Sequence, residues 1–289
     1  MSNQDNQVFQ NGYHENNTDR LVFYIPSSIR HVVITKQQIV PAFAFEGCDL
    51  IESISISNTT TTISKYAFWQ CKNLKFFIIP NSVSLIESAA FTECISLERI
   101  NSSKTGLAIV PKGVQRIGAY AFNGLSCITK FELPLSLTMI EVGAFANCIK
   151  LEELYIPNNV SSIGDGIVTG CIALSSLEVS SSNSTFYSEG NCIIRDTTLL
   201  AACKASIIPN NRGITRIGVL AFSGYEGTLV LPGTITFIDD GAFRNCNISC
   251  IKYEGTIQAW KQKVSKNKYW DRGLNNYVVQ CEDGTIENP

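Results

Sequence analysis

The chain contains few of the side chains on which enzymes and metal sites depend. Only two of its 289 residues are histidines, His14 and His31, and neither has a neighbouring set of ligands in the sequence. Zinc sites and cysteine nucleophiles need histidines or closely paired cysteines in defined positions. The P-loop, G-x-G-x-x-G and G-x-S-x-G motifs are also missing. We therefore expect no catalytic residue, no metal site and no cofactor, and a protein that is not an enzyme.

Charge is scarce as well. Charged residues make up 17% of the chain, the net charge is −2, and lysine and arginine form no cluster. Proteins that bind nucleic acid carry such clusters, so we expect no nucleic-acid partner. No apolar run reaches the roughly 18–20 residues of a membrane-spanning helix. The composition leaves the oligomeric state open.

The first residues lack the basic and apolar segments of a secretory signal. Two interpretations remain open: the protein stays inside the cell, or the chain is a piece of a longer exported protein. We expect the polar residues 1–20 to form a flexible leader.

What the chain does have is a repeated phrase, Ala-Phe followed three residues later by Cys. Complete copies carry Phe45, Phe68, Phe91, Phe145 and Phe243, and partial copies carry Phe122, Val168 and Phe222. The steps from Phe45 to Phe68 and from Phe68 to Phe91 are 23 residues each. A fixed period of this size indicates a solenoid of stacked coils, because one unit cannot bury its apolar face alone.

Six of the 11 cysteines occupy one position of the repeat: Cys48, Cys71, Cys94, Cys148, Cys171 and Cys246. Unpaired cysteines are commonly buried as small apolar side chains, so we expect these six to be buried free thiols. A disulfide between Cys192 and Cys203, across a hairpin, remains an open alternative.

Each cysteine is followed by an alternating apolar pattern, such as Leu151-x-x-Leu154-x-Ile156-Pro157. Alternation predicts a strand with one buried side, and the proline ends its pairing. A shorter motif, such as Val160-x-x-Ile163-Gly, then leads into the Ala-Phe segment. We expect that segment to form one turn of α- or 3₁₀-helix on the convex side.

The combined unit resembles the leucine-rich repeats of BspA-like surface proteins, close to L-x-x-I-x-I-P-x-x-V-x-x-I-G-x-x-A-F-x-x-C. The resemblance extends from about Ser28 to Tyr253. It implies a right-handed, strand-rich leucine-rich-repeat solenoid of the α/β class, with about nine coils of about 23 residues. Longer steps between repeats place insertions near 102–108 and 183–206, and the second insertion resembles a hairpin common in that family.

The resemblance implies three parts: the leader 1–20, the solenoid 21–253 and a C-terminal cap 254–289. The tail is similar to a segment that closes many bacterial members of the family. Thr256 is a suitable N-cap for a helix over residues 257–264, with Trp260 facing inward. Residues 277–279 are expected to pair as a last strand.

The register of the strands points alternate side chains outward, onto the concave face of such a solenoid. Exposed apolar and aromatic groups on one sheet face often mark a binding surface. The candidate partner-binding residues are Phe76, Ile78, Arg99, Lys130, Glu132, Glu153, Tyr155 and Glu178. We expect a non-catalytic module that binds a protein, which the resemblance implies is a host or matrix protein contacted in adhesion at a cell surface. The alternative is an intracellular interaction scaffold that is not exported.

Overall fold

A computed structural model of the chain describes residues 29–264, 269–272, 274 and 276–287, together with 13–14 and 21–22. The predicted leader lies outside these residues except for β1 (Tyr13–His14), which pairs antiparallel with β2 (Leu21–Val22). The chain forms two compact units. Unit 1 comprises residues 1–151 and 159–164, and unit 2 comprises residues 152–158 and 165–289.

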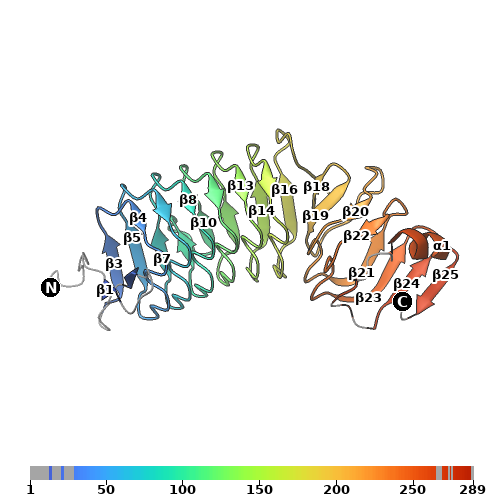
Figure 1. The fold of residues 1–289 in the computed structure, drawn as a ribbon, viewed down its shortest axis with the longest axis horizontal. Helices are drawn as coiled ribbons and strands as arrows, with labels where there is room; N and C mark the ends of the chain where they lie inside the picture. The colour runs from blue at the N-terminus through green and yellow to red at the C-terminus, as the bar shows by residue number, and fades with distance from the viewer. Residues whose placement is uncertain are drawn as a thin grey trace. The chain divides into compact units, whose positions relative to one another are not determined.

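Unit 1 is a stack of coils with a parallel sheet on each of two sides (Figure 1). Its first sheet contains β3 (His31–Ile34), β5 (Ser53–Ile56), β7 (Phe76–Ile78), β9 (Arg99–Ile100), β10 (Leu107–Ile109) and β12 (Lys130–Glu132). The second contains β4 (Ile39–Val40), β6 (Thr62–Ile63), β8 (Leu85–Ile86), β11 (Arg116–Ile117), β13 (Met139–Ile140) and β15 (Ser162–Ile163). Pairing joins the same position of successive repeats, as in Ile54 with Phe77. The predicted solenoid is confirmed, with about ten turns of about 23 residues in the chain as a whole.

Unit 2 begins with the parallel pair β14 (Glu153–Ile156) and β16 (Ser176–Val179). A five-stranded sheet follows, made of β17 (Tyr187–Glu189), β18 (Cys192–Arg195), β19 (Thr198–Ala202), β20 (Arg216–Ile217) and β22 (Phe237–Ile238). A four-stranded sheet contains β21 (Glu226–Leu231), β23 (Asn247–Tyr253), β24 (Val278–Cys281) and β25 (Gly284–Glu287). Because β17, β18 and β19 pair antiparallel, the hairpin predicted in the second insertion is confirmed.

Stacked phenylalanine rings fill the core of unit 1. Phe45, Phe68, Phe91, Phe122 and Phe145 form a continuous stack, with neighbouring centroids 5.2–6.0 Å apart and planes within 19° of parallel. Phe77 reaches in from the first sheet and meets the rings of Phe68 and Phe91 edge-on, at 4.7 and 4.9 Å. Offset stacks and edge-to-face pairs are the favoured arrangements of aromatic rings, so the repeated phenylalanine stabilises each coil against the next.

The Ala-Phe segments form turns, so the expected α- or 3₁₀-helix is wrong. Two residues in each turn have left-handed backbone angles, as Tyr66 (φ 58°) and Gln70 (φ 59°) do. The Phe68 N–H donates to the Ala90 carbonyl of the next coil at 2.9 Å, whereas the Cys71 N–H donates back to Phe68 at 3.2 Å. Left-handed residues interrupt a helical run. Bonds to the next coil alternate with bonds within the turn, so the turns form a third row of hydrogen bonds between coils, beside those of the two sheets.

The cysteines of the repeat also join the coils. All eleven cysteines are free thiols, including Cys192 and Cys203, so the alternative disulfide between those two does not form. Four of the six repeat cysteines are buried, and Cys48 and Cys246 are half-buried. The thiols of Cys71, Cys94, Cys148 and Cys246 donate to the carbonyl of the phenylalanine in the preceding coil, at 2.8–3.2 Å.

The C-terminal segment contains the capped helix and the strand that the sequence predicts, with two differences in their form. Thr256 caps a helix by accepting a hydrogen bond from the Ala259 N–H at 3.1 Å. The helix is α-helical only over α1 (Ile257–Ala259) and continues as a π-helix, η1 (Trp260–Val264), with Trp260 buried. The strand predicted at 277–279 is β24, which begins one residue later and is followed by β25.

Replacing Phe145 by alanine tests the ring stack. Phe145 is fully buried against Phe122 and Phe131, so Phe145→Ala should lower the free energy of unfolding by about 3–5 kcal/mol. Phe237→Ala is the matched control, because that ring is 38% exposed and should cost about 1 kcal/mol or less. Urea unfolding of both variants measures the difference, and equal losses would contradict the assigned register.

The six repeat cysteines should resist labelling in the folded protein. Burial raises the pKa of Cys48 to about 12 and that of Cys246 to about 11, so neither forms the reactive thiolate at pH 8, and the other four are buried. A chromogenic disulfide reagent should therefore react more slowly with these six thiols in the native protein than after unfolding, when all 11 thiols are accessible.

The same pKa shifts set a pH dependence. Between the ordinary thiol pKa of 9.0 and the raised values, the unfolded chain releases protons that the folded chain keeps. The contribution of these thiols to the free energy of unfolding is complete below about pH 9 and decreases as the pH rises further.

In the labelling experiment, repeat cysteines that react in the native protein as fast as in the unfolded chain would refute the buried arrangement.

Candidate functional site

The outward side of the first sheet in unit 1 carries two parallel rows of side chains. Residues that pair across the strands fix the rows: Phe76 with Arg99, Leu107 with Lys130, and Ile109 with Glu132. One row starts at His31 and continues through Ser53, Phe76, Arg99, Leu107 and Lys130. The other row, two residues further along each strand, contains Val33, Ser55, Ile78, Ile109 and Glu132. The structure therefore brings together five of the predicted contact residues on one face.

The aromatic ring in these rows is partly covered by its neighbour. The Arg99 guanidinium carbon lies 4.8 Å from the centre of the Phe76 ring, and Arg99 is also 3.7 Å from the Glu98 carboxylate. An arginine above an aromatic face is attracted by the ring's electron density. Phe76 is consequently half-buried, whereas Ile78 beside it is 41% exposed.

The segment near 102–108, predicted to be an insertion and not a strand, leads into a strand on this face, β10. Leu107 and Ile109 of β10 point outward, and Ala108 between them is buried. The signal was present in the sequence: the alternation through Ala108 and Val110 ends at Pro111, as it does in other coils. Two further apolar side chains thus extend the face between the predicted residues.

Asn101 holds the added strand in place. Because β9 ends at Ile100, a gap opens between β7 and β10, and the Asn101 side chain spans it. Its Oδ1 accepts from the Ile79 N–H at 2.8 Å, and its Nδ2 donates to the carbonyls of Ile79 and Ile109 at 3.0 and 3.1 Å. Asn101 has a left-handed backbone (φ 50°), which asparagine tolerates better than most residues. The amide replaces a missing length of strand.

The remaining three predicted residues lie in unit 2. Tyr155 pairs with Glu178 across β14 and β16, and Glu153 pairs with Ser176. Tyr155 is 51% exposed, and both glutamates are exposed beside it. This patch is acidic and aromatic, whereas the face in unit 1 is apolar with cations at Arg99 and Lys130.

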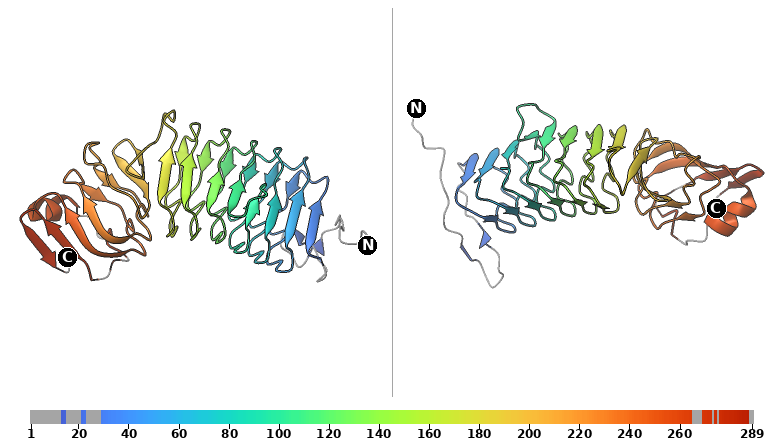
Figure 2. Two further views of the ribbon diagram at one scale, coloured as in Figure 1. Left: turned by 180° about the vertical axis from the view of Figure 1, so that it is seen from behind. Right: turned by 90° about the horizontal axis from the view of Figure 1, so that it is seen from above.

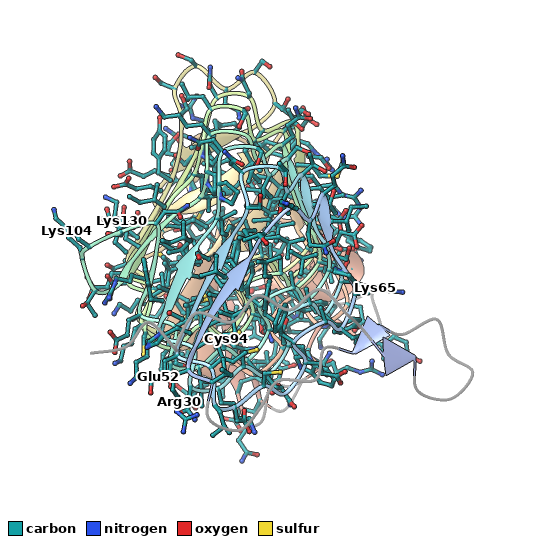
Figure 3. All side chains as sticks on the ribbon, turned by 90° about the vertical axis from the view of Figure 1, so that its left-hand side faces the viewer. Arg30, Glu52, Lys65, Cys94, Lys104 and Lys130 are labelled. Carbon is teal, nitrogen blue, oxygen red and sulfur yellow. The ribbon has the colours of Figure 1, made fainter. Side chains whose placement is uncertain are left out.

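A view along the coils shows the side on which Lys130 lies (Figure 3). Lys130 and Lys104 project to one side and Lys65 projects to the other. In this view, Cys94 lies between the two sides. Lys104 belongs to the loop that precedes β10 and is exposed. The parallel strands that carry the two rows lie side by side in both views of Figure 2.

In the row that starts at His31, the His31 Nδ1 lies 2.7 Å from the Ser53 Oγ. Among the residues that the structure describes, no three histidine, cysteine, aspartate or glutamate side chains gather as metal ligands would. In the same part of the chain, no helix has the length and apolar character to cross a membrane.

Known proteins resemble this chain in sequence pattern and in fold. The pattern of the BspA type leucine rich repeat region matches residues 18–109, 108–199 and 193–269. No curated protein matches the sequence. A leucine rich cell surface protein from Faecalibacterium prausnitzii has a similar fold, with a TM-score of 0.56, 22% identity, and coverage of 86% of this chain and 69% of that one.

Two further solved structures share the fold at lower identity. A leucine-rich repeat protein from Bacteroides ovatus gives a TM-score of 0.56 at 20% identity, covering 93% of this chain and 65% of that one. The pneumococcal vaccine antigen PcpA gives 0.52 at 16% identity, covering 88% and 89%. The chain thus spans about two thirds of the length of the first two proteins. Since the repeat pattern extends over most of its length, the chain belongs to the BspA type leucine rich repeat family.

Proposed function

We propose that the chain binds a protein partner through the outward face of the first sheet in unit 1. The observation that carries this proposal is the group of apolar side chains there: Phe76 and Ile78 on β7, and Leu107 and Ile109 on β10, the two strands that flank the short strand β9. Arg99, Lys130 and Glu132 border it. Protein interfaces combine an apolar centre containing aromatic and arginine anchors with a polar rim. We propose recognition without a reaction, which membership of the repeat family supports.

The rigidity of the face supports this role. Each outward side chain stands on a strand whose alternate residues are buried, such as Phe77 beside Phe76 and Ala108 beside Leu107. The cation–π contact to Arg99 and the Asn101 bridge restrict the strands further. A surface that is ordered before binding loses less conformational entropy when a partner docks.

We propose Tyr155 as the centre of a second contact patch, in unit 2, with Glu153 and Glu178. Tyrosine supplies a large contact area together with a polar group, and it is enriched at interfaces. The acidic neighbours favour a basic region on the partner, whereas the cations of the unit 1 face favour an acidic one.

We further propose that residues 254–289 cap the solenoid. Trp270 meets the last ring of the repeat, Phe243, edge-on at 5.9 Å, and Trp260 and Tyr277 pack on Trp270 at 5.3 and 5.8 Å. An uncovered end of a solenoid exposes an apolar face and a sheet edge, which a cap protects from water and from other chains.

The biological setting that we propose is adhesion or partner binding at a cell surface. The support is family membership and a similar fold in a protein described as a leucine rich cell surface protein. Protease treatment of intact source cells tests this setting. Loss of the protein on treatment would support surface display, and full protection in the soluble fraction would favour the intracellular scaffold.

Changing the outward residues to serine tests the proposed surface. A variant with Phe76→Ser, Ile78→Ser and Tyr155→Ser removes the two exposed centres while the buried residues stay. Immobilised wild-type protein is first screened against purified host-surface and matrix proteins, and the dissociation constant of the tightest binder is then measured. The variant should bind that partner about 10- to 100-fold more weakly, as the loss of two or three anchors implies.

Leu135→Ser is the matched control, because Leu135 is 68% exposed and lies off the sheet. The control should bind like the wild type, and all variants should unfold at similar temperatures. Unchanged binding by a folded triple variant would disprove the assigned surface.

A further inference from the structure

A cavity of about 620 Å³ in unit 2 borders an open strand edge. Ser206, Ile207, Ile208 and Pro209 form one of its walls, and Thr228, Leu229 and Val230 of β21 form another. β21 stands at the end of its four-stranded sheet and pairs only with β23 in the described part of the chain. Cavities of about 300–1,000 Å³ are typical of ligand sites.

The open edge presents backbone groups to the cavity. On the paired side of β21, the carbonyls of Tyr225 and Leu231 accept from Asn247 and Glu254 of the neighbouring chain segment, both at 2.9 Å. Backbone groups of successive residues in a strand point to opposite sides. The N–H and C=O groups of Thr228 and Val230 therefore point away from β23, toward the cavity. Such an edge is a template for another strand.

The opposite wall is held firmly. The Ile207 N–H donates to the Gly190 carbonyl at 2.9 Å. A Cβ atom on residue 190 would lie 2.1 Å from the Ile207 carbonyl oxygen, so only glycine permits this close approach. The contact fixes the backbone of Ile207 and leaves its side chain 75% exposed, across the cavity from Val230, which is 45% exposed.

The charges around the cavity have one sign. Its lining includes two carboxylates, Glu189 and Glu254, and no lysine or arginine. Arg212, outside the lining, forms an ion pair with Glu189. Glu254 makes no ion pair with any residue that the structure describes. A basic side chain would therefore be favoured beside Glu254.

We infer that the edge of β21 binds an extended peptide, supplied by a partner protein, in which an apolar residue and a basic residue stand two positions apart and so share one face of the added strand. The peptide would add a strand beside β21 through Thr228 and Val230, place its apolar side chain against Ile207 and Val230, and place a basic side chain near Glu254. Strand addition of this kind takes its affinity from the main chain and its specificity from alternate side chains. The inference goes beyond the function proposed above, since it uses other residues and backbone recognition.

A labelled hexapeptide with lysine at positions one and five, valine at position three and threonine at the other positions is the probe, and fluorescence polarisation with the full chain measures its binding. Two control peptides separate the contributions. One carries N-methyl groups along its backbone, which remove strand donors but keep the charge. The other carries glutamate in place of lysine. We expect saturable binding of the probe and about tenfold or weaker binding of each control.

Three protein variants complete the test. Val230→Pro removes one edge donor while the bonds to β23 remain, and proline is tolerated on edge strands. Ile207→Lys places a cation in the cavity, and Leu135→Lys makes the same change at an exposed site in unit 1. The first two should weaken binding about tenfold, and the third should change it less than about twofold.

Three results would overturn the inference: no saturable binding of the probe, equal binding of the N-methylated peptide, or equal binding by the two lysine variants. A wild-type dimer that Ile207→Lys dissociates in sedimentation would also overturn it, because a second copy would then occupy the edge. Circular dichroism establishes that each variant is folded. If Val230→Pro does not fold, the peptide controls and the lysine pair still decide the question.

Discussion

Every part of the structure depends on one constraint, the hydrogen-bonded register between coils. Each coil bonds to the next at the same position of the repeat, in the two sheets of unit 1 and along the turns. A residue type that recurs every 23 residues is therefore stacked on itself. This is why phenylalanines form a stack of rings and cysteines form a ladder of thiols. It also explains why outward side chains line up in rows.

The sequence predicts those parts of the fold that this constraint repeats. The period, the buried phenylalanines and cysteines, the antiparallel hairpin and the Thr256 cap all follow from local patterns or from the family resemblance. The Ala-Phe segments resemble helix in sequence because the pattern A-F-x-x-C has no feature that excludes a helix, although the segments form turns. The flanking positions favour a turn, because several coils have glycine or asparagine there with left-handed backbone angles, as at Gly143 and Asn147.

The candidate surface was predicted in part for the same reason. Phe76, Ile78 and Tyr155 were identified because they occupy regular positions of regular coils. The strand containing Leu107 and Ile109 was missed because it breaks the period, and a break in the period reads as a loop. Nothing in the sequence indicates that the Asn101 amide would join two strands, since that contact depends on the early end of β9. The open edge of β21 likewise depends on tertiary pairing.

The two proposed surfaces would recognise partners by different physics. The face in unit 1 offers side chains on strands that are paired on both sides, so its specificity comes from shape, apolar area and charge. The edge in unit 2 offers main-chain groups, which any extended segment can match, and relies on Ile207, Val230 and Glu254 for selectivity. One chain thus combines a side-chain surface and a backbone surface.

The thiol ladder has a consequence for the unfolded chain. In the folded protein, four of the six ladder thiols donate to a carbonyl of the preceding coil, and burial limits the access of oxidants to them. Once the chain unfolds, all 11 sulfurs become available together, and an odd number leaves at least one without an intramolecular partner. Wrong disulfides formed at that stage would tie together coils that must stack in order. The native structure shields the ladder cysteines. In oxidising solution, unfolding therefore becomes irreversible soon after that structure is lost.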